Sequence, residues 1–180
     1  MNPDYSRIRQ PRSPQWLLAL VLSLPLVASA LPDDREQPIH IEADRAELDQ
    51  RRGITTYEGD VRMRQGSMRI EADKVIIHTN EANDVERVEA HGSPAHLQQR
   101  RDPERGPMHA RADAIDYDVA REQVLLLRNA SLEQDGSTMS GNRINYNMLE
   151  DLVNITGERD SDSPRVEMVI PPRTRTPAED

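Results

Sequence analysis

The sequence predicts an all-β fold: a folded-over, mostly antiparallel sheet built from repeats of one bent pair of strands. The segment IHIEADRAEL at residues 39–48 returns as MRIEADKVII at residues 68–77. Apolar and polar residues alternate within each copy, which is the period of a strand with one buried face. Phenylalanine is absent and aromatic residues make up 3% of the chain. The interior must therefore be aliphatic.

Each copy of the repeat places apolar residues at offsets 0, 2, 4, 7 and 9 from its first residue. Copies begin at Ile39, Met68 and Met108, and a weaker one begins at Ser137. These offsets spread too widely for one face of a helix. The step of three residues after offset 4 shifts the alternation, so both halves face one interior only if the strand bends there. Offset 5 holds residues whose side chains bond readily to nearby backbone, namely Asp44, Asp73, Asp113 and Asn142.

Further strand-like runs lie between and after the copies, at residues 57–65, 85–97, 123–132, 152–155 and 165–170. The run 85–97 bends around Gly92-Ser93-Pro94. Turn-forming residues separate the runs at 51–53, 65–66, 80–83, 135–136 and 148–151, and a polar loop with prolines is expected at 98–107. One bent pair cannot bury its apolar face alone, so the pairs are expected to stack.

Residues 1–30 have the pattern of a secretory signal peptide. A basic start precedes an apolar run at residues 16–28, and Ala28-Ser29-Ala30 is a small-x-small cleavage signal. The run of 13 residues is short for a membrane span; an uncleaved anchor is the alternative. Cleavage leaves a β-domain at 31–170 and a proline-rich tail at 171–180 that is predicted to be disordered. With no cysteine in the chain, these features predict a soluble periplasmic protein.

Composition and residue spacing argue against several functional classes. Residues 31–180 hold 20 basic and 31 acidic residues, a net charge of −11, so a nucleic-acid partner is not expected. His91 and His96 flank Ser93, but no third metal ligand and no nucleophile-elbow pattern accompany them. Histidines on polar strand faces are usually solvated. We therefore expect no catalytic residue, no metal and no cofactor.

The apolar stripe contains many small residues, including Ala43, Ala72, Ala110, Ala112 and Gly141. Part of the stripe must form the core. Small residues lining a broad sheet also leave space, which favours a groove for a long aliphatic molecule. Each buried CH₂ of such a molecule contributes about 0.8 kcal/mol.

Several segments, in this order, resemble the OstA-like family: QPIHIEAD at 37–44, YEGDV at 57–61, IEADKVII at 70–77, GSPA at 92–95 and the pair Ile115 and Tyr117. The resemblance covers residues 38–170. It implies a V-shaped open β-jellyroll with a hydrophobic groove and no enzymatic activity. It also implies a lipopolysaccharide carrier that binds the lipid A acyl chains. Its implied partners are an inner-membrane lipopolysaccharide-export complex, an outer-membrane lipopolysaccharide translocon and further copies of itself, joined head to tail.

The inward phase and the resemblance together predict the lipid contacts. They are Ile39, Ile41, Ala43, Leu48, Ile70, Val75, Ile77, Leu97, Ile115 and Tyr117. The first and last strands present unpaired backbone groups, so an oligomer edge is predicted at Ile39, Val166, Met168 and Ile170. Arginine is expected to make any phosphate contact, because residues 31–180 contain one lysine and 19 arginines. Arg62, Arg64 and Arg69 are candidates; a solvated strand face is the alternative.

Two other functions remain open at this point. One is a periplasmic assembly or structural module that acts only by adding a β-strand to its partners. The other is a hydrolase on a β-scaffold. A groove open along its length, with apolar walls, would favour lipid transport, a closed dry core would favour the module, and a convergent cluster of serine, histidine and acid would favour the hydrolase.

Overall fold

The computed structural model describes residues 34–157 and 165–172, in which all strands belong to one ten-stranded antiparallel sheet. The strands are β1 (His40–Glu42), β2 (Arg45–Asp49), β3 (Ile54–Gln65), β4 (Met68–Thr79), β5 (Val85–Gln99), β6 (Met108–Asp118), β7 (Gln123–Gln134), β8 (Ser137–Asn147), β9 (Leu152–Thr156) and β10 (Glu167–Val169). A 3-10 helix, η1 (Asp34–Glu36), precedes them. The all-β prediction is confirmed, although β10 is shorter than the predicted run 165–170. The predicted signal peptide and residues 173–180 of the predicted tail lie outside the described residues.

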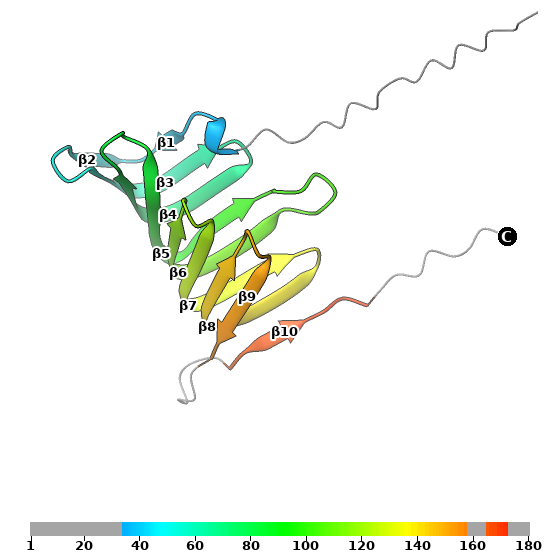
Figure 1. Cartoon of the computed structure of the whole chain (residues 1–180). Helices are drawn as coiled ribbons and strands as arrows, with labels where there is room; N and C mark the ends of the chain where they lie inside the picture. Colours follow the sequence, from blue (N-terminus) through cyan, green and yellow to red (C-terminus); the bar gives the residue numbers. More distant parts are fainter. Residues whose placement is uncertain (1–33, 158–164, 173–180) are drawn as a thin grey trace, which may run out of the picture.

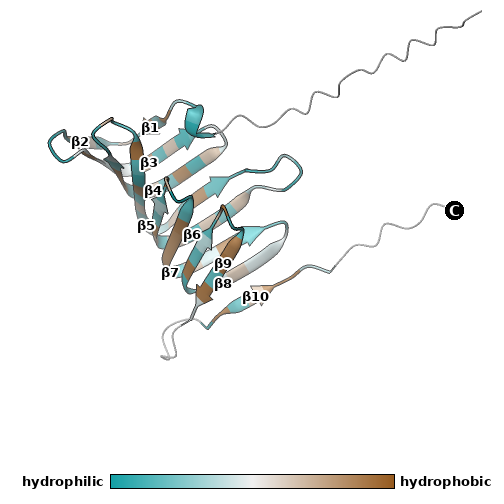
Figure 2. Cartoon of the chain, in the orientation of Figure 1, coloured by the Kyte–Doolittle hydropathy of each residue, from teal (hydrophilic) through white to brown (hydrophobic). Residues whose placement is uncertain are grey.

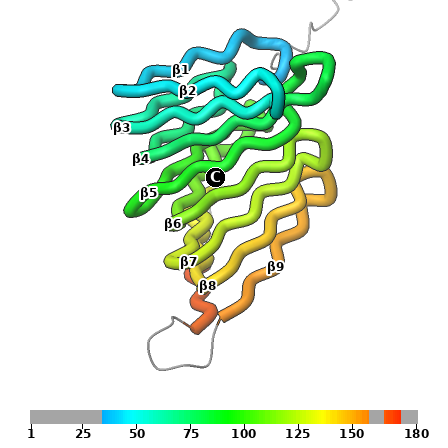
Figure 3. Tube along the Cα trace, turned by 90° about the vertical axis from the view of Figure 1, so that its left-hand side faces the viewer, coloured from blue at the N-terminus to red at the C-terminus, as the bar shows by residue number. Residues whose placement is uncertain are grey.

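The strands β3 to β8 each pair with the next strand in the chain, as Figure 3 shows. The two edges of the sheet are composite. Strands β1 and β2 pair with the two halves of β3, and β10 and β9 pair with the two halves of β8. The described part of the chain contains no helix that is long and apolar enough to cross a membrane.

A shift in pairing register interrupts each strand pair from β3–β4 to β7–β8 near its middle. The shifts fall between Glu58 and Val61, Glu71 and Lys74, His91 and Ala95, Arg111 and Ala114, and Leu127 and Ala130. Together they form a line along which the sheet folds into a V (Figure 1). We call this the fold line.

The bend predicted at offset 5 of the repeat is confirmed. Asp73 and Asp113 lie within the register shifts, and Asp44 separates β1 from β2, where its backbone N–H donates to the Gly59 carbonyl at 3.1 Å. On β7, Arg128 and Asn129 take the left-handed conformation, with φ of 62° and 48°. The Asn129 amide donates to the Asp113 carboxylate at 3.1 Å, which joins two neighbouring strands at the bend.

The fold line divides the sheet into two facing layers. Layer A comprises β1, β10 and residues 61–65, 68–72, 95–99, 108–112, 130–134 and 137–141. Layer B comprises β2, β9 and residues 54–58, 74–79, 85–91, 114–118, 123–127 and 143–147. The layers join at the fold line, and the turns at their far ends form the open side of the V.

Inward-facing residues form rows that cross each layer from edge to edge, and Figure 2 shows hydrophobic and hydrophilic segments alternating along the strands. The row in layer A consists of Ile41, Met63, Ile70, Leu97, Ala110, Leu132, Met139 and Met168. A row in layer B consists of Leu48, Thr55, Ile77, Val88, Tyr117, Val124, Tyr146 and Val153. The middle of each row is buried, whereas Leu48 is 61% exposed and Met168 53% exposed. The core thus runs the length of the sheet and is uncovered at both edges.

The first prediction concerns the fold line. Asn129→Ala should lower the free energy of unfolding by about 1–2 kcal/mol, because alanine is strained in the left-handed region and the bond to Asp113 is lost. Urea denaturation measures the change. Asn129→Gly also removes this bond, but glycine adopts the left-handed conformation without strain. Its free energy of unfolding should therefore fall by less than that of the alanine variant. Equal stability of the alanine variant and the unchanged protein would contradict this account of the bend.

Candidate functional site

A cavity of about 440 Å³ lies at the open side of the V, near the edge formed by β1. Its apolar lining comes from Ile39, Met63, Met68, Val85, Val88, Tyr117 and Val119, and its polar lining from Asp34, Arg35, Gln37, Gln65, Asn83, Asp84 and Gln99. Ligand pockets commonly have volumes of about 300–1,000 Å³ and mostly apolar walls. This cavity is suited to an apolar group that enters between polar turns.

A smaller cavity, of about 240 Å³, lies on the same side toward the edge formed by β9. Arg105 joins the turns of the two layers beside it, with Nε 2.8 Å from Asp135 Oδ2 and Nη1 3.5 Å from Asp151 Oδ2. The guanidinium of Arg105 holds the pKa of Asp135 below its usual value. The Tyr146 hydroxyl donates to Asp151 at 2.9 Å, and burial together with this carboxylate raises the pKa of Tyr146 to about 12. The lining of this cavity combines charged side chains with the apolar side chains of Met108 and Met148.

Three charged side chains connect the layers between the two cavities, and we call them the clamp: Arg35, Arg101 and Glu122. Glu122, in the turn after β6, is 9% exposed. Its Oε1 lies 3.1 Å from Arg35 Nη2, and its Oε2 lies 2.6 Å from Arg101 Nη2. Arg101 also donates to the carbonyl of Met148. Arg35 lies in η1, which contacts the β3–β4 turn of layer A, and Arg101 lies in the loop after β5 of the same layer. Glu122 belongs to a turn of layer B, so these bonds hold the open side of the V together.

Gln99 lines both cavities, so its side chain lies between them. It is 8% exposed, and its Nε2 donates to Asp34 Oδ2 at 2.9 Å. Its Oε1 is buried and has no hydrogen-bond partner among the described residues. Buried amide oxygens without a partner are rare in folded proteins.

The structure divides the predicted lipid contacts into three groups. Ile39 and Tyr117 line the larger cavity. Buried between the layers are Ile70, Val75, Ile77, Leu97 and Ile115, and Ile41 is partly buried against them. Ala43 and Leu48 are exposed near the β2 edge, since no strand covers them there. Of the predicted contacts, Ile39 and Tyr117 therefore lie at the larger cavity on the open side of the V.

Two of the small inward residues, Ala110 and Ala112, do not leave the space that the sequence suggested. Ala110 and Ala112 are both 0% exposed, because larger side chains of the core pack over them.

Of the predicted edge residues, Met168 lies in β10, and Val166 and Ile170 are exposed beside it. Arg62 and Arg64 pair with Asp60 and Glu42 on the exposed outer face.

Several cavity and clamp residues were not predicted. Alternation along β3 and β5 places Met63 and Val88 on the inward face, so these two were within reach of the sequence pattern. The clamp residues and Gln99 carry no local signal, because they come from segments far apart in the chain.

His96 stacks on His109, with ring centroids 5.4 Å apart. Within the described residues, no group of three or more potential ligands is placed to hold a metal ion.

Comparison with known proteins places these features in a family. Residues 40–151 match the family described as "LptA/(LptD N-terminal domain) LPS transport protein". The lipopolysaccharide export system protein LptH of Pseudomonas aeruginosa is 37% identical over 153 residues, which cover 83% of this chain and 87% of that protein. The lipopolysaccharide export system protein LptA of Escherichia coli K12 is 34% identical over 139 residues, or 74% of this chain and 75% of LptA.

A solved structure gives the same result. The crystal structure of LptH, described as the LptA homologous periplasmic component of the conserved lipopolysaccharide transport device of Pseudomonas aeruginosa, superposes with a TM-score of 0.70 at 35% identity. The match covers 78% of this chain and 100% of that chain. The family resemblance drawn from the sequence motifs is confirmed. The chain belongs to the LptA/(LptD N-terminal domain) family of lipopolysaccharide transport proteins.

Proposed function

We propose that the chain is a periplasmic lipopolysaccharide-binding protein that carries lipopolysaccharide from the inner to the outer membrane. It shields the acyl chains between its two layers and acts as one unit of a head-to-tail bridge. The larger cavity carries this proposal, because its apolar walls lie at the open side of the V in a member of a transport family. The relatives LptA and LptH are named as export system proteins.

Acyl-chain burial supplies the driving force. Each CH₂ that leaves water contributes about 0.8 kcal/mol, and Met63, Val88 and Tyr117 provide an apolar wall. A lipid with several acyl chains needs more room than the cavity offers, so the layers must move apart to admit it. Within the described residues, the strands β3 to β8 pass from one layer into the other at the fold line, and the opposite side can open.

The periplasmic location is part of the proposal. The solved relative LptH is described as periplasmic, and residues 1–30 have the pattern of a cleaved signal peptide. The family is one of transport proteins, so we assign no reaction and no cofactor. Among the described residues, those that line the larger cavity include neither serine nor histidine, so this lining gives a hydrolase no support.

The head-to-tail bridge is supported by the composite edges. Pairing β10 of one copy with β1 of the next would continue the row of Met168 with Ile41, and pairing β9 with β2 would continue the row of Val153 with Leu48. Contacts between unlike edges are heterologous and produce open rods. We propose that the β1–β2 edge meets the inner-membrane export complex and the β9–β10 edge the outer-membrane translocon, a polarity that follows from the family resemblance.

The alternative function is a periplasmic assembly module that acts only by strand addition. It would use the same two edges, whose backbone groups are free to pair. An apolar cavity at the mouth of the V has no role in strand addition. We therefore favour the lipid carrier.

The second prediction tests lipid contact. A photo-crosslinking residue at Ile39 or Tyr117 should label lipopolysaccharide, because both side chains line the larger cavity. The matched controls are Glu42 and Asp116, which lie on the outward faces of β1 and β6. Labelling is read on gels with an antibody against the ligand. If the inward positions label no more strongly than the controls, the cavity does not hold the lipid.

The third prediction tests the bridge. Met168→Pro should shorten the rods, because proline removes a backbone donor from the middle of β10 and disfavours strand addition. Concentration-dependent light scattering measures rod length, and circular dichroism checks that the variant is folded. Met168→Ala removes the side chain but keeps the donor, so it separates the two contributions. Unchanged rods in a folded proline variant would exclude this edge as the joint.

A further inference from the structure

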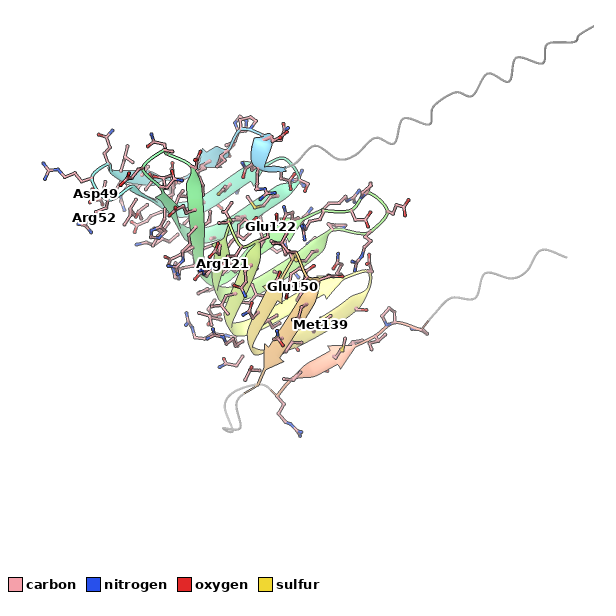
Figure 4. All side chains as sticks on the ribbon, viewed as in Figure 1. Asp49, Arg52, Arg121, Glu122, Met139 and Glu150 are labelled. Atoms are coloured by element: carbon pink, nitrogen blue, oxygen red, sulfur yellow. The ribbon has the colours of Figure 1, made fainter. Side chains whose placement is uncertain are left out.

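The clamp brings two arginines to one carboxylate at the point where the layers meet. Glu122 has a side chain that is only 12% exposed, whereas Arg35 and Arg101 are 47% and 39% exposed. The guanidinium groups are therefore accessible from solvent at the mouth of the V, while the carboxylate that occupies them lies behind. Figure 4 labels Glu122 next to Arg121 on this turn and Glu150 on the neighbouring turn.

We propose that Arg35, Arg101 and Gln99 form a binding site for the phosphorylated sugar headgroup of an acylated lipid, which Glu122 occupies in the free chain. The headgroup phosphate displaces the Glu122 carboxylate from the two arginines. This inference rests on the proposed function and adds to it the place where the headgroup binds. It also couples headgroup binding to opening of the V, because the displaced bonds connect the two layers.

The chemistry of the two arginines fits a phosphate. Guanidinium groups bind phosphate and carboxylate oxygens through the same planar set of donors, so one anion can replace the other. The printed contacts of both arginines with Glu122 run through Nη2, at 3.1 Å for Arg35 and 2.6 Å for Arg101. A phosphate has more acceptor oxygens than a carboxylate, so it can replace both contacts.

Gln99 provides a second, independent indication of a ligand. Its buried Oε1 lacks a partner among the described residues, and the residue lines both cavities. A sugar hydroxyl or the amide N–H of an N-acylated sugar is a donor of the required type. Gln99 thus favours an acylated sugar over an anion without donors.

The backbone of Glu122 is held in a strained conformation. Its φ is +47°, in the left-handed region that residues with a side chain rarely adopt. The turn is fixed by hydrogen bonds from Met148 N to Glu122 O at 2.9 Å and from Glu122 N to Val119 O at 3.4 Å. The side chain is therefore positioned by the turn, and it can leave the arginines while the turn stays attached to layer B.

Neighbouring acids limit the site to lipid-linked anions. Asp34 and Asp84 line the larger cavity, and Asp102 and Asp151 line the smaller one. Asp34 already accepts bonds from Ser67 N, Ser67 Oγ and Gln99 Nε2 at 2.6, 2.7 and 2.9 Å. A free phosphate must compete with a tethered carboxylate of high effective concentration. A lipid-linked phosphate gains acyl-chain burial in addition, so it displaces Glu122 where the free ion does not.

The experiment measures binding of three ligands to the purified protein. They are lipopolysaccharide with its lipid A phosphates, the same lipopolysaccharide after enzymatic removal of those phosphates, and inorganic phosphate. The readout is the ratio of the affinities for the phosphorylated and dephosphorylated lipids. This ratio cancels any general effect of loosening the clamp, because both lipids must separate the layers.

Two substitutions remove the proposed phosphate-binding groups, and a third removes the carboxylate that competes with the phosphate. Replacing both Arg35→Gln and Arg101→Gln should lower the ratio by about tenfold, the loss expected for charge-assisted contacts. Glu122→Gln should raise the ratio, because the competing carboxylate is gone. Arg121→Gln and Glu150→Gln are the controls, because both side chains are exposed, Arg121 adjoins Glu122 and Glu150 lies on the neighbouring β8–β9 turn; the ratio should stay unchanged.

The outcomes separate this inference from the proposed function. If the unchanged protein binds neither lipid, the proposed function is wrong. If it binds both lipids and the ratio is the same in all variants, the headgroup site is wrong and lipid transport stands. Binding of inorganic phosphate as tightly as phosphorylated lipid would overturn the lipid-linked part of the proposal. Glu122→Gln, which keeps the size of the side chain, serves alone if the double arginine variant does not fold.

Discussion

A one-residue shift of the apolar alternation in the middle of the strands is the constraint on which the rest of the structure depends. Alternation at a period of two would otherwise turn the second half of each strand outward. The register shifts at the fold line keep the same face inward in both halves. One sheet can therefore cover its own apolar face, and rows of mostly aliphatic residues, together with Tyr117 and Tyr146, close a core without any phenylalanine.

The same constraint explains why charged groups hold the open side. Layers made from halves of the same strands are joined covalently at the fold line, so among the described residues contacts between η1, the loops and the turns hold the opposite side. In this chain Arg35, Arg101 and Glu122 supply those contacts, with Arg105 and Asp151 nearby. Partly exposed ion pairs exchange readily with solvent or another ion. A mouth closed by such pairs can open without disrupting the buried rows.

The sequence predicted the fold better than the site. The repeat located the bends at Asp44, Asp73 and Asp113, because a phase shift can be read locally. It did not identify Asn129, whose conformation depends on its neighbour across the sheet. The phase of the apolar alternation predicted which face of the sheet Leu48 occupies. The exposure of Leu48 depends instead on whether another strand covers the edge. The clamp escaped prediction for a similar reason, since its residues become neighbours only when separate turns meet.

The charge of the chain limits how a phosphorylated lipid can be held. At a formal net charge of −9, the protein repels a polyanionic lipid at long range. Screening confines this repulsion to about 10 Å at moderate salt, so binding must come from acyl-chain burial and short-range contacts. Arginines already paired with a carboxylate satisfy this requirement, because they attract an anion only where it can replace Glu122. In a bridge joined through the edge rows, the apolar wall would continue from one unit to the next, and the acyl chains would move between units without crossing water.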